Sequence, residues 1–299
     1  MSVVLITGAG SGFGALTART LAAAGHTVYA SMRDVAARNA DRARSLLDWA
    51  RENSADLRVV ELDTGDEASA AAAVKTVVAE QGRLDVLVNN AGMLVIGPTE
   101  AFTPEQVAHC FDVNVIGHLR VNRAVLPRMR EQGGGLVVYV GSVTSEITSP
   151  FQGPYVAAKA AEDRLAETTF YENSAFGIDC VIVQPGAYTS GTDHFAGARH
   201  PEDTERAAVY SGLRERVEAL ASSLDSLALP GARTDVEEVA ERIRDVIAME
   251  PGTRPARVVV DPQHHGAQEV NAVRAERQRT MLRRMGMEDV TSVRDPGRA

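Results

Sequence analysis

Short apolar stretches alternate along the chain with longer stretches that are rich in alanine and charged residues. The apolar stretches consist largely of Val, Ile and Leu without regular polar alternation, which is typical of strands buried on both faces. We expect strands at Ser2–Ile6, Thr27–Ala30, Leu57–Glu61, Leu84–Val88, Leu136–Val140, Ile178–Val183 and Arg257–Val260. The intervening stretches predict helices at Ala15–Ala24, Val35–Arg51, Asp66–Gln81, Pro104–Arg130, Tyr155–Ala175 and Asp235–Met249.

This alternation predicts an α/β fold with a doubly wound parallel sheet, the Rossmann arrangement. Since no Pro-, Gly- or Ser-rich linker interrupts the pattern, we expect one domain over residues 1–262. A long excursion, about residues 187–231, separates the sixth strand from the seventh and contains a charged helical piece. Long excursions of this kind are usually functional or disordered. Residues 263–299 form a predicted helical C-terminal tail.

Composition excludes several classes of protein. Among 299 residues, 40 are acidic and 31 basic, which gives a formal net charge of −9. This sign disfavours nucleic acids and anionic membranes as partners. The sequence contains no run of about 18 apolar residues, so we expect no membrane-spanning helix. The first cation is Arg19, so we expect no targeting segment. Two cysteines, Cys110 and Cys180, fit a reducing cytoplasm, and the scattered histidines predict no metal site.

A glycine-rich segment follows the first predicted strand directly. Its sequence is GAGSGFG, from Gly8 to Gly14, and an apolar helix is expected after it. Glycine lets the backbone turn tightly and approach a phosphate, while the helix directs its N-terminal amides at the loop. This order of elements predicts a dinucleotide site. The spacing G-x-G-x-x-G is not met, because Phe13 stands at its third glycine, and the pattern present is Thr7-Gly8-x-x-x-Gly12-x-Gly14.

With this spacing the sequence resembles the short-chain dehydrogenase/reductase family, whose core branch opens on T-G-x-x-x-G-x-G. The related sugar-nucleotide epimerases use T-G-x-x-G-x-x-G, which would require glycine in place of Ser11. The resemblance covers about residues 2–190. It implies that NAD or NADP binds across the loop and contacts Gly8, Ser11, Gly12, Phe13 and Gly14.

Residues after the second predicted strand bear on the choice between NAD and NADP. An acid about twenty residues beyond the loop bonds the adenosine ribose and selects NAD. By resemblance, Met32 occupies the position of that acid, and Arg33 the position where several NADP-dependent members carry arginine. A guanidinium pairs bidentately with a 2′-phosphate. We therefore expect a preference for NADP, although Asp34 leaves an alternative contact to the ribose open.

Further cofactor contacts are implied by the family register after the third and fourth strands. Asp63 and Thr64 stand where the family places an aspartate against the adenine amino group. Asn90, Ala91 and Gly92 lie at the carboxyl edge of the sheet, where ligands collect in open α/β folds. The two small residues allow the backbone to approach the ribose, and Asn90 resembles the family residue that braces the central strands.

A turn after the sixth strand completes the implied cofactor site. Pro185 and Gly186 bring the chain over the nicotinamide. The family usually has threonine five residues after this proline, to bond the carboxamide. Ser190 stands at that position with Thr189 beside it, so either hydroxyl could serve.

Tyr155 and Lys159 stand in YVAAK at the start of a predicted helix. The i, i+4 spacing puts both on one face, roughly 5–6 Å apart at Cβ. A phenol with a pKa of about 10 is a poor catalyst at neutral pH, but a nearby ammonium lowers that pKa. A tyrosine so tuned can give a proton to a carbonyl oxygen or take one from an alcohol. By resemblance this is the family's reacting pair, and Lys159 also bonds the nicotinamide ribose.

Two further residues match the family's catalytic set. Ser142 ends the fifth strand, where its hydroxyl can hold the substrate oxygen beside the tyrosine, with Ser145 and Thr144 as rivals. Asn114 matches the fourth member, whose helix is locally distorted in the family and binds a water that relays protons toward the lysine. A plain alternative for Asn114 is a polar residue that bonds its own helical turn.

These residues predict reversible reduction of a ketone or aldehyde to an alcohol by hydride transfer with NAD(P)H, with tyrosine as general acid and base. The alternatives are a catalytically silent NAD(P)-binding sensor or scaffold, and an epimerase or dehydratase. We expect a small-molecule substrate in an apolar pocket walled by Met93–Ile96, Val143–Ile147, Tyr188 and residues 191–230. The family resemblance also implies a homodimer or homotetramer.

Overall fold

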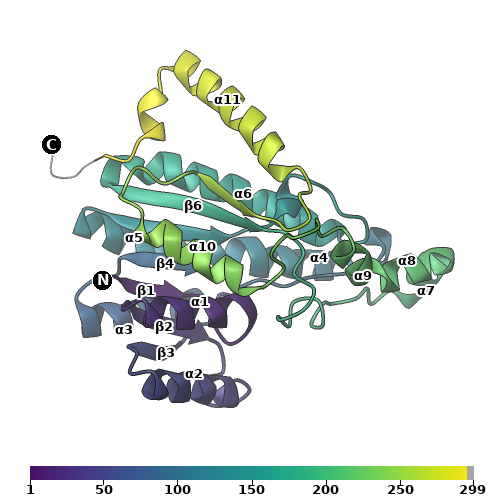
Figure 1. Cartoon of the computed structure of the whole chain (residues 1–299), viewed down its shortest axis with the longest axis horizontal. Coiled ribbons are helices and arrows are strands. Elements are labelled where there is room, and N and C mark those ends of the chain that lie inside the picture. The colour runs from purple at the N-terminus through teal and green to yellow at the C-terminus, as the bar shows by residue number, and fades with distance from the viewer. Residues whose placement is uncertain (295–299) are drawn as a thin grey trace.

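Seven parallel strands form one sheet in the order β3-β2-β1-β4-β5-β6-β7, in a computed structural model that describes residues 1–294 (Figure 1). This is the predicted doubly wound sheet. The strands are β1 (Val3–Ile6), β2 (Thr27–Met32), β3 (Leu57–Glu61), β4 (Val86–Asn89), β5 (Gly135–Val140), β6 (Ile178–Pro185) and β7 (Arg257–Val260). The chain reverses its direction of winding between β1 and β4, so a crevice opens where their carboxyl ends diverge.

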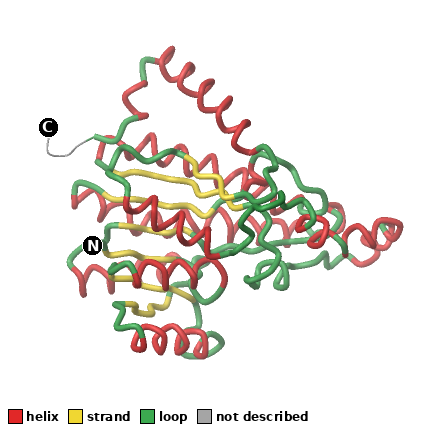
Figure 2. The backbone as a smooth tube through the Cα atoms, viewed as in Figure 1, coloured by secondary structure: helices red, strands yellow, loops and turns green. Residues whose placement is uncertain are grey.

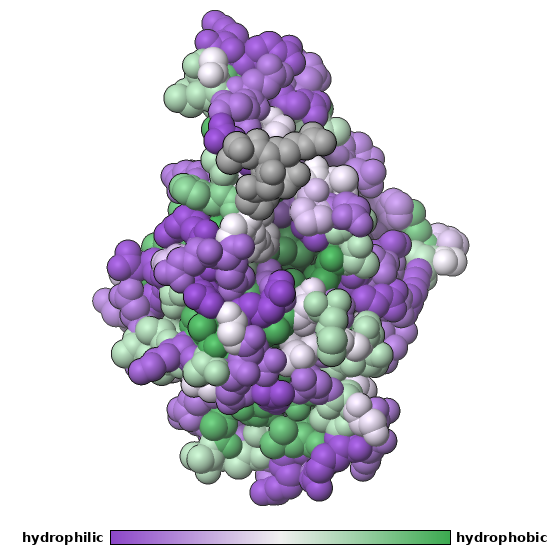
Figure 3. Space-filling model, turned by 90° about the vertical axis from the view of Figure 1, so that its left-hand side faces the viewer, coloured by the Kyte–Doolittle hydropathy of each residue, from purple (hydrophilic) through white to green (hydrophobic). Residues whose placement is uncertain are grey.

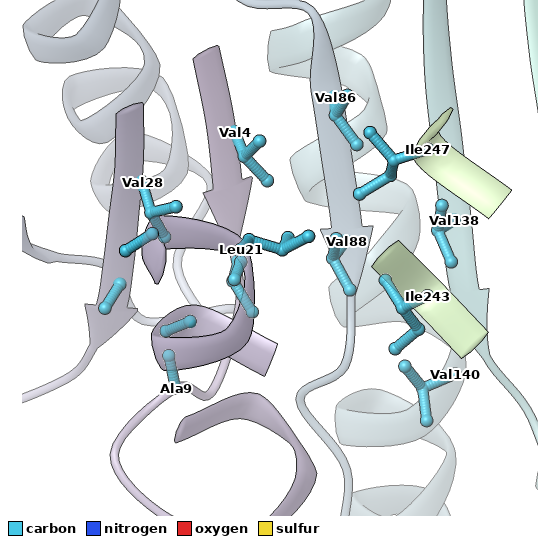
Figure 4. Packing of buried hydrophobic residues seen from close by; sticks show 14 of the residues in the cluster. Val4, Ala9, Leu21, Val28, Val86, Val88, Val138, Val140, Ile243 and Ile247 are labelled. Carbon is cyan, nitrogen blue, oxygen red and sulfur yellow. The ribbon is translucent and has the colours of Figure 1, made fainter. Parts of the chain in front are cut away.

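Helices cover both faces of the sheet (Figure 2). One face is covered by α1 (Gly12–Ala23), α2 (Ala40–Glu52) and α10 (Glu237–Ala248), and the other by α3 (Glu67–Gln81), α5 (Gly117–Gln132) and α6 (Gly153–Asn173). Each face therefore packs into its own hydrophobic cluster. Figure 4 shows Leu21 of α1 and Ile243 and Ile247 of α10 lying against strand valines of the first cluster. Because both faces of the sheet are buried, the sequences of its strands are apolar at nearly every position.

Two predicted helices differ from the observed ones. The helix expected at 35–51 begins at Ala40, because the chain first turns at Asp34, whose carbonyl accepts hydrogen bonds from the amides of Ala37 and Asn39. The helix expected at 104–130 is divided into α4 (Pro104–Phe111), a π-helical turn at Asp112–Ile116, and α5. Hydrophobic periodicity does not reveal such a turn, because the apolar stripe continues through it.

The excursion between β6 and β7 carries short helices rather than the single predicted piece. They are α7 (Thr204–Val209), α8 (Arg214–Glu218) and α9 (Leu220–Asp225). Figure 1 shows them projecting beyond the carboxyl end of the sheet. The excursion is fastened to the loop after β4, because the amide of Ile96 donates to the carbonyl of Arg199 at 2.9 Å and the amide of Arg199 donates to the carbonyl of Leu94 at 2.9 Å.

The C-terminal segment forms α11 (Ala267–Met285), which stands away from the rest of the molecule at the β7 side (Figure 1). Arg274 anchors this helix by pairing with the buried Glu146, and Asn271 donates to the Gln184 side chain at 2.6 Å. Residues 295–299 of the predicted tail lie outside the described residues.

The molecular face on the side of the N terminus is mainly hydrophilic, with hydrophobic residues showing between charged ones (Figure 3). Across residues 1–294, no helix combines the length and apolar character that a membrane crossing requires. The opposite end of the sheet, where the strands' carboxyl ends lie, holds the cavity described next.

Candidate active site

The glycine loop forms a narrow cradle between β1 and α1. Gly8 has a φ of 64° and Gly12 a φ of 54°, which side chains rarely adopt. A Cβ at Gly14 would lie 2.4 Å from the side-chain nitrogen of Asn90 and 2.6 Å from the carbonyl oxygen of Gly8. Glycine at 14 therefore lets α1 pack closely against the loops that follow β1 and β4. Ser11 at the N-cap makes no side-chain hydrogen bond to the helix. The backbone N–H groups at the N-terminus of α1 are suited to bind a pyrophosphate.

The loop after β4 is tied to the glycine loop by side chains. The buried Thr7 hydroxyl accepts the amide protons of Asn90 at 2.9 Å and Ala91 at 3.0 Å. The Asn90 side chain donates back to the Thr7 carbonyl at 2.8 Å. Asn90 therefore links the loop after β4 to the end of β1, and the family role that the resemblance implies for it stays a prediction. Each such bond contributes about 1 kcal/mol, so together they hold the two halves of the cradle at a fixed separation.

Three arginines line the cavity beyond β2, at the end implied for adenosine. They are the predicted Arg33 together with Arg38 and Arg42, which the sequence reasoning had not selected. Asp34 does not line the cavity, and its carboxylate lies 3.5 Å from the guanidinium of Arg38. Met32, at the position of the NAD-selecting acid, is buried. Arg42 pairs with Asp193 at 2.9 Å, so Arg38 and Arg42 both have carboxylate partners, and no ion pair is found for Arg33 within the described residues. The rival contact from Asp34 is directed to Arg38 instead of the cavity.

Ser142, Tyr155 and Lys159 converge where β5 ends against α6. All three are buried and line the same cavity. The Ser142 oxygen accepts a hydrogen bond from the amide of Thr144 at 3.1 Å and one from its hydroxyl at 2.9 Å. The Lys159 ammonium donates to the carbonyl of Val140 at 2.8 Å, which draws it toward the strand end. A phenol, a hydroxyl and an ammonium group therefore lie around the same part of the cavity.

Burial dominates the electrostatics of the phenol. It raises the pKa of Tyr155 above its ordinary value, while the Lys159 ammonium and a hydrogen bond with Ser142 oppose the rise. Burial also acts to lower the pKa of Lys159, yet that pKa is raised because the Glu162 carboxylate stabilises the ammonium. The lysine is therefore held in its cationic form, as a residue that assists a phenolate must be.

Asn114 lies in the π-helical turn and behind the cavity wall. Its side-chain oxygen accepts from the amide of Met93 at 3.1 Å, and its nitrogen donates to the carbonyls of Met93 at 3.1 Å and Cys110 at 2.9 Å. The helix is distorted at Asn114, as the resemblance implied. The Asn114 side chain also bonds the carbonyl of Cys110 in its own turn, which is the alternative interpretation. The water relay attributed to Asn114 stays a prediction.

The cavity measures about 990 Å³ and runs from the arginines past the glycine loop to Tyr155. Of the predicted cofactor residues, it brings together Gly8, Ser11, Gly12, Phe13, Arg33, Asp63, Thr64, Asn90, Ala91, Gly92, Tyr155, Lys159, Pro185 and Gly186. Gly14 and Ser190 do not line it. Ser190 is exposed, and the neighbouring Thr189 hydroxyl donates to Asp225, whereas Thr192 does line the cavity. The carboxamide contact of Ser190 stays a prediction.

The substrate end of the cavity is formed partly by the excursion. The His194 ring packs edge-on to Tyr155 with ring centroids 5.7 Å apart. Burial, assisted by the Lys159 ammonium, lowers the pKa of His194 to about 4, so its imidazole is neutral at physiological pH. The sequence offered no signal for this contact, because a lone histidine in an irregular segment carries no periodicity. The predicted wall residues that line the cavity are Met93, Leu94, Val143, Thr144, Ile147 and Tyr188, together with Thr192, Asp193, His194, Phe195, Gly197, Arg199, Leu224 and Leu227 of residues 191–230. Val95, Ile96, Ser145 and Glu146 do not line it.

Comparisons with known proteins bear on this site. The model of the family described as short chain dehydrogenase matches residues 2–203. The chain is 35% identical over 189 residues to 3-ketodihydrosphingosine reductase of Bacteroides thetaiotaomicron, covering 63% of this chain and 65% of that protein. It is 37% identical over 190 residues to 17-beta-hydroxysteroid dehydrogenase type 1 of Homo sapiens, covering 62% of this chain and 56% of that protein.

A solved structure extends the likeness to nearly the whole chain. The short-chain dehydrogenase from Streptomyces avermitilis matches with a TM-score of 0.71 and 29% identity, covering 96% of this chain and 98% of that one. By contrast, the alignments span less than two thirds of the length of either curated relative. The matched part contains the glycine loop, Ser142, Tyr155 and Lys159.

Proposed function

Because this chain belongs to the short-chain dehydrogenase family, we propose that it interconverts an apolar ketone or aldehyde and the corresponding alcohol, with NADP(H) as the preferred cofactor. The observation that carries the proposal is the convergence of Tyr155, Ser142 and Lys159 on a cavity continuous with the glycine cradle. When bound, the cofactor supplies the hydride that the carbonyl carbon takes up. The chain's own residues supply the proton and the positions.

In the direction of reduction, the Tyr155 hydroxyl gives its proton to the carbonyl oxygen as the carbon–oxygen double bond becomes single. Ser142 directs its hydroxyl proton to the same oxygen, because its own oxygen already accepts bonds from Thr144. Lys159 stabilises the phenolate that remains. In the reverse direction the phenolate takes the proton from the alcohol. General acid–base catalysis of this kind contributes typically 10²- to 10⁴-fold.

An apolar substrate is supported by the residues nearest Tyr155. Apolar residues of the cavity lining include Met93, Leu94, Ile147, Phe195 and Leu224. All of them except Ile147 belong to, or pack against, the hydrophobic cluster that contains Tyr155. The two relatives are named for a long-chain sphingoid ketone and a 17β-hydroxysteroid, both largely apolar.

Incubation with NADPH and a panel of apolar ketones tests the proposal. We expect cofactor oxidation matched by alcohol formation; binding of NADPH with no turnover across the panel would instead favour a silent sensor.

The preference for NADP rests on Arg33, which lines the cavity after β2. Arg33→Ala is expected to raise the KM for NADPH by about ten- to hundred-fold, since a charge-assisted contact with the 2′-phosphate contributes about 1.5–3 kcal/mol. The KM for NADH should change little. Steady-state kinetics with both cofactors measures the difference. Arg44→Ala is the matched control, because Arg44 is an exposed arginine of α2 that pairs with Asp41 outside the cavity. Equal effects of Arg33→Ala on both cofactors would refute the NADP assignment.

A further inference from the structure

The first turns of α11 lie at the carboxyl edge of the sheet, the edge that carries the active site (Figure 1). Arg274 of this helix bonds Glu146, which stands four residues after Ser142. Its Nη1 donates to Oε2 of Glu146 at 2.7 Å, and its Nη2 donates to Oε1 at 2.5 Å. Two parallel bonds of this kind fix the orientation of both side chains as well as their separation. The guanidinium therefore holds the end of the turn that begins at Ser142.

Glu146 depends on this arginine because its carboxylate is buried. The Glu146 side chain is 3% exposed, and that of Arg274 is 19% exposed. Within residues 1–294, the other cation that pairs with Glu146 is Arg164, whose guanidinium lies 3.9 Å away on a side chain that is 46% exposed. A buried carboxylate without a close cation is strongly disfavoured. We therefore expect Glu146 to move if Arg274 is removed.

The turn between Ser142 and Glu146 is short and closed by its own hydrogen bonds. The amide of Ser145 donates to the carbonyl of Ser142 at 3.1 Å. The amide of Glu146 donates to the carbonyl of Val143 at 3.0 Å. The same turn contains Thr144, whose amide and hydroxyl donate to the Ser142 hydroxyl oxygen. A displacement of Glu146 would therefore disturb the contacts that orient the Ser142 hydroxyl.

A second residue of α11 is connected to the same turn. Asn271 donates to the side-chain oxygen of Gln184 at 2.6 Å and accepts from Arg274 at 2.8 Å. The Gln184 nitrogen donates to the Ser145 hydroxyl at 3.0 Å and to the buried Asp163 carboxylate at 3.1 Å. Side chains from β6, α6 and α11 thus hold this turn together, and Arg274 supplies the charge that faces Glu146.

We propose that Arg274 is a positioning residue, which acts through Glu146 to hold the Ser142 hydroxyl in the direction that the substrate oxygen requires. Arg274 does not line the cavity, so its effect on the reaction is indirect. The catalytic consequence rests on the proposed function, whereas the anchoring of the turn does not. The C-terminal helix is on this basis a support of the active site.

Kinetics of ketone reduction with NADPH tests the proposal. Arg274→Gln is expected to lower kcat about tenfold, because a small misplacement of a group beside the reacting atoms slows the reaction strongly. The KM for NADPH should stay unchanged, since Arg274 bonds no residue of the glycine loop. Arg283→Gln is the matched control, because Arg283 is an exposed arginine of α11 that pairs with the exposed Glu288. It should leave both constants unchanged.

Combination with Ser142→Ala separates positioning from a general loss of structure. If Arg274 acts through the Ser142 hydroxyl, Arg274→Gln should change kcat by less than about twofold in a chain that already carries Ser142→Ala. A structural role would instead lower kcat by the same factor in both backgrounds. Equal factors, or an unchanged kcat in the single variant, would overturn the proposal.

Arg274→Lys covers the case in which Arg274→Gln does not fold. The ammonium keeps a cation beside Glu146 but cannot form the two parallel bonds of a guanidinium. We therefore expect a folded protein whose kcat is lowered several-fold. This loss should again disappear in the Ser142→Ala background, and its persistence there would count against the proposal.

Hydrogen exchange followed by mass spectrometry provides a readout that needs no turnover. In Arg274→Lys we expect the backbone amides of residues 143–147 to exchange several-fold faster, because the turn opens locally more often. Amides of β1 and α1 should keep their rates, whereas a global loss of stability would accelerate exchange in these elements too. Unchanged exchange over residues 143–147 would contradict the inference. An original chain without turnover, together with faster exchange in the variant, would count against the proposed function alone.

Discussion

Tyr155→Phe is expected to lower kcat for ketone reduction by about 10²- to 10⁴-fold, the usual contribution of a positioned general acid. The phenyl ring keeps the packing against His194 but has no proton to give. Cofactor affinity should stay nearly unchanged, because the glycine cradle and the arginines are untouched. Stopped-flow single-turnover kinetics together with NADPH titration separates the two quantities.

Tyr171→Phe provides the matched control for this experiment. Tyr171 lies on the same helix and its hydroxyl donates to Glu167 at 3.0 Å, away from the cavity. We expect this variant to keep full turnover. Full turnover in Tyr155→Phe as well would show that the proton comes from another group.

Ser142→Ala is expected to lower kcat by about 10²-fold or more, comparable to the loss of one donor from an oxyanion site. With its oxygen already accepting two bonds from Thr144, the Ser142 hydroxyl is left to donate, and the carbonyl oxygen beside Tyr155 is the acceptor we assign to it. When no ketone is bound, the same proton is donated to Tyr155 and lowers its pKa, and Ser142→Ala removes that contact as well. Steady-state kinetics with a fixed ketone measures the loss.

Ser145→Ala distinguishes Ser142 from its rival in the sequence. The Ser145 hydroxyl donates to the carbonyl of Ser142 at 2.8 Å and accepts from Gln184 at 3.0 Å, and it does not line the cavity. We therefore expect only a few-fold change in kcat. If Ser145→Ala proved as damaging as Ser142→Ala, strand-end position would not be what selects the functional serine.

The glycine cradle and the sheet were predictable because their physics is local. A Val- and Ile-rich stretch that runs into Gly8 and Gly12 leaves few alternatives to a strand, a turn and a helix. The position of Tyr155 and Lys159 beside each other was equally predictable, since a spacing of four residues places them on one face of a helix. The family resemblance supplied the register of Ser142 and Asn114, which spacing alone would not have fixed.

Other parts of the site depend on contacts between residues far apart in the sequence. Arg38 and Arg42 reach the cavity only because the chain turns at Asp34 before α2 begins. His194 contacts Tyr155 because hydrogen bonds at residues 199 and 200 hold the excursion against the loop after β4. No periodic pattern marks such residues in advance.

Glu162 shows a different limit of sequence reasoning. In a stretch with acidic and basic neighbours it looks like part of a solvated helix face, yet it is buried between Lys159 and His118. The partner histidine lies 44 residues earlier and shares no motif with it. Only the packing of α5 against α6 makes the pair visible.

We propose that a bound nicotinamide cofactor would supply hydride directly to the carbonyl carbon of a ketone held beside Tyr155. Reaction of an accepted ketone with NADPH deuterated at the transferable position of nicotinamide carbon 4 tests it, with the product alcohol analysed by mass spectrometry and NMR. We predict one deuterium at the carbinol carbon for each cofactor oxidised, with a single configuration at that carbon when the two ketone substituents differ. Alcohol without deuterium, or cofactor oxidation without alcohol, would contradict the account.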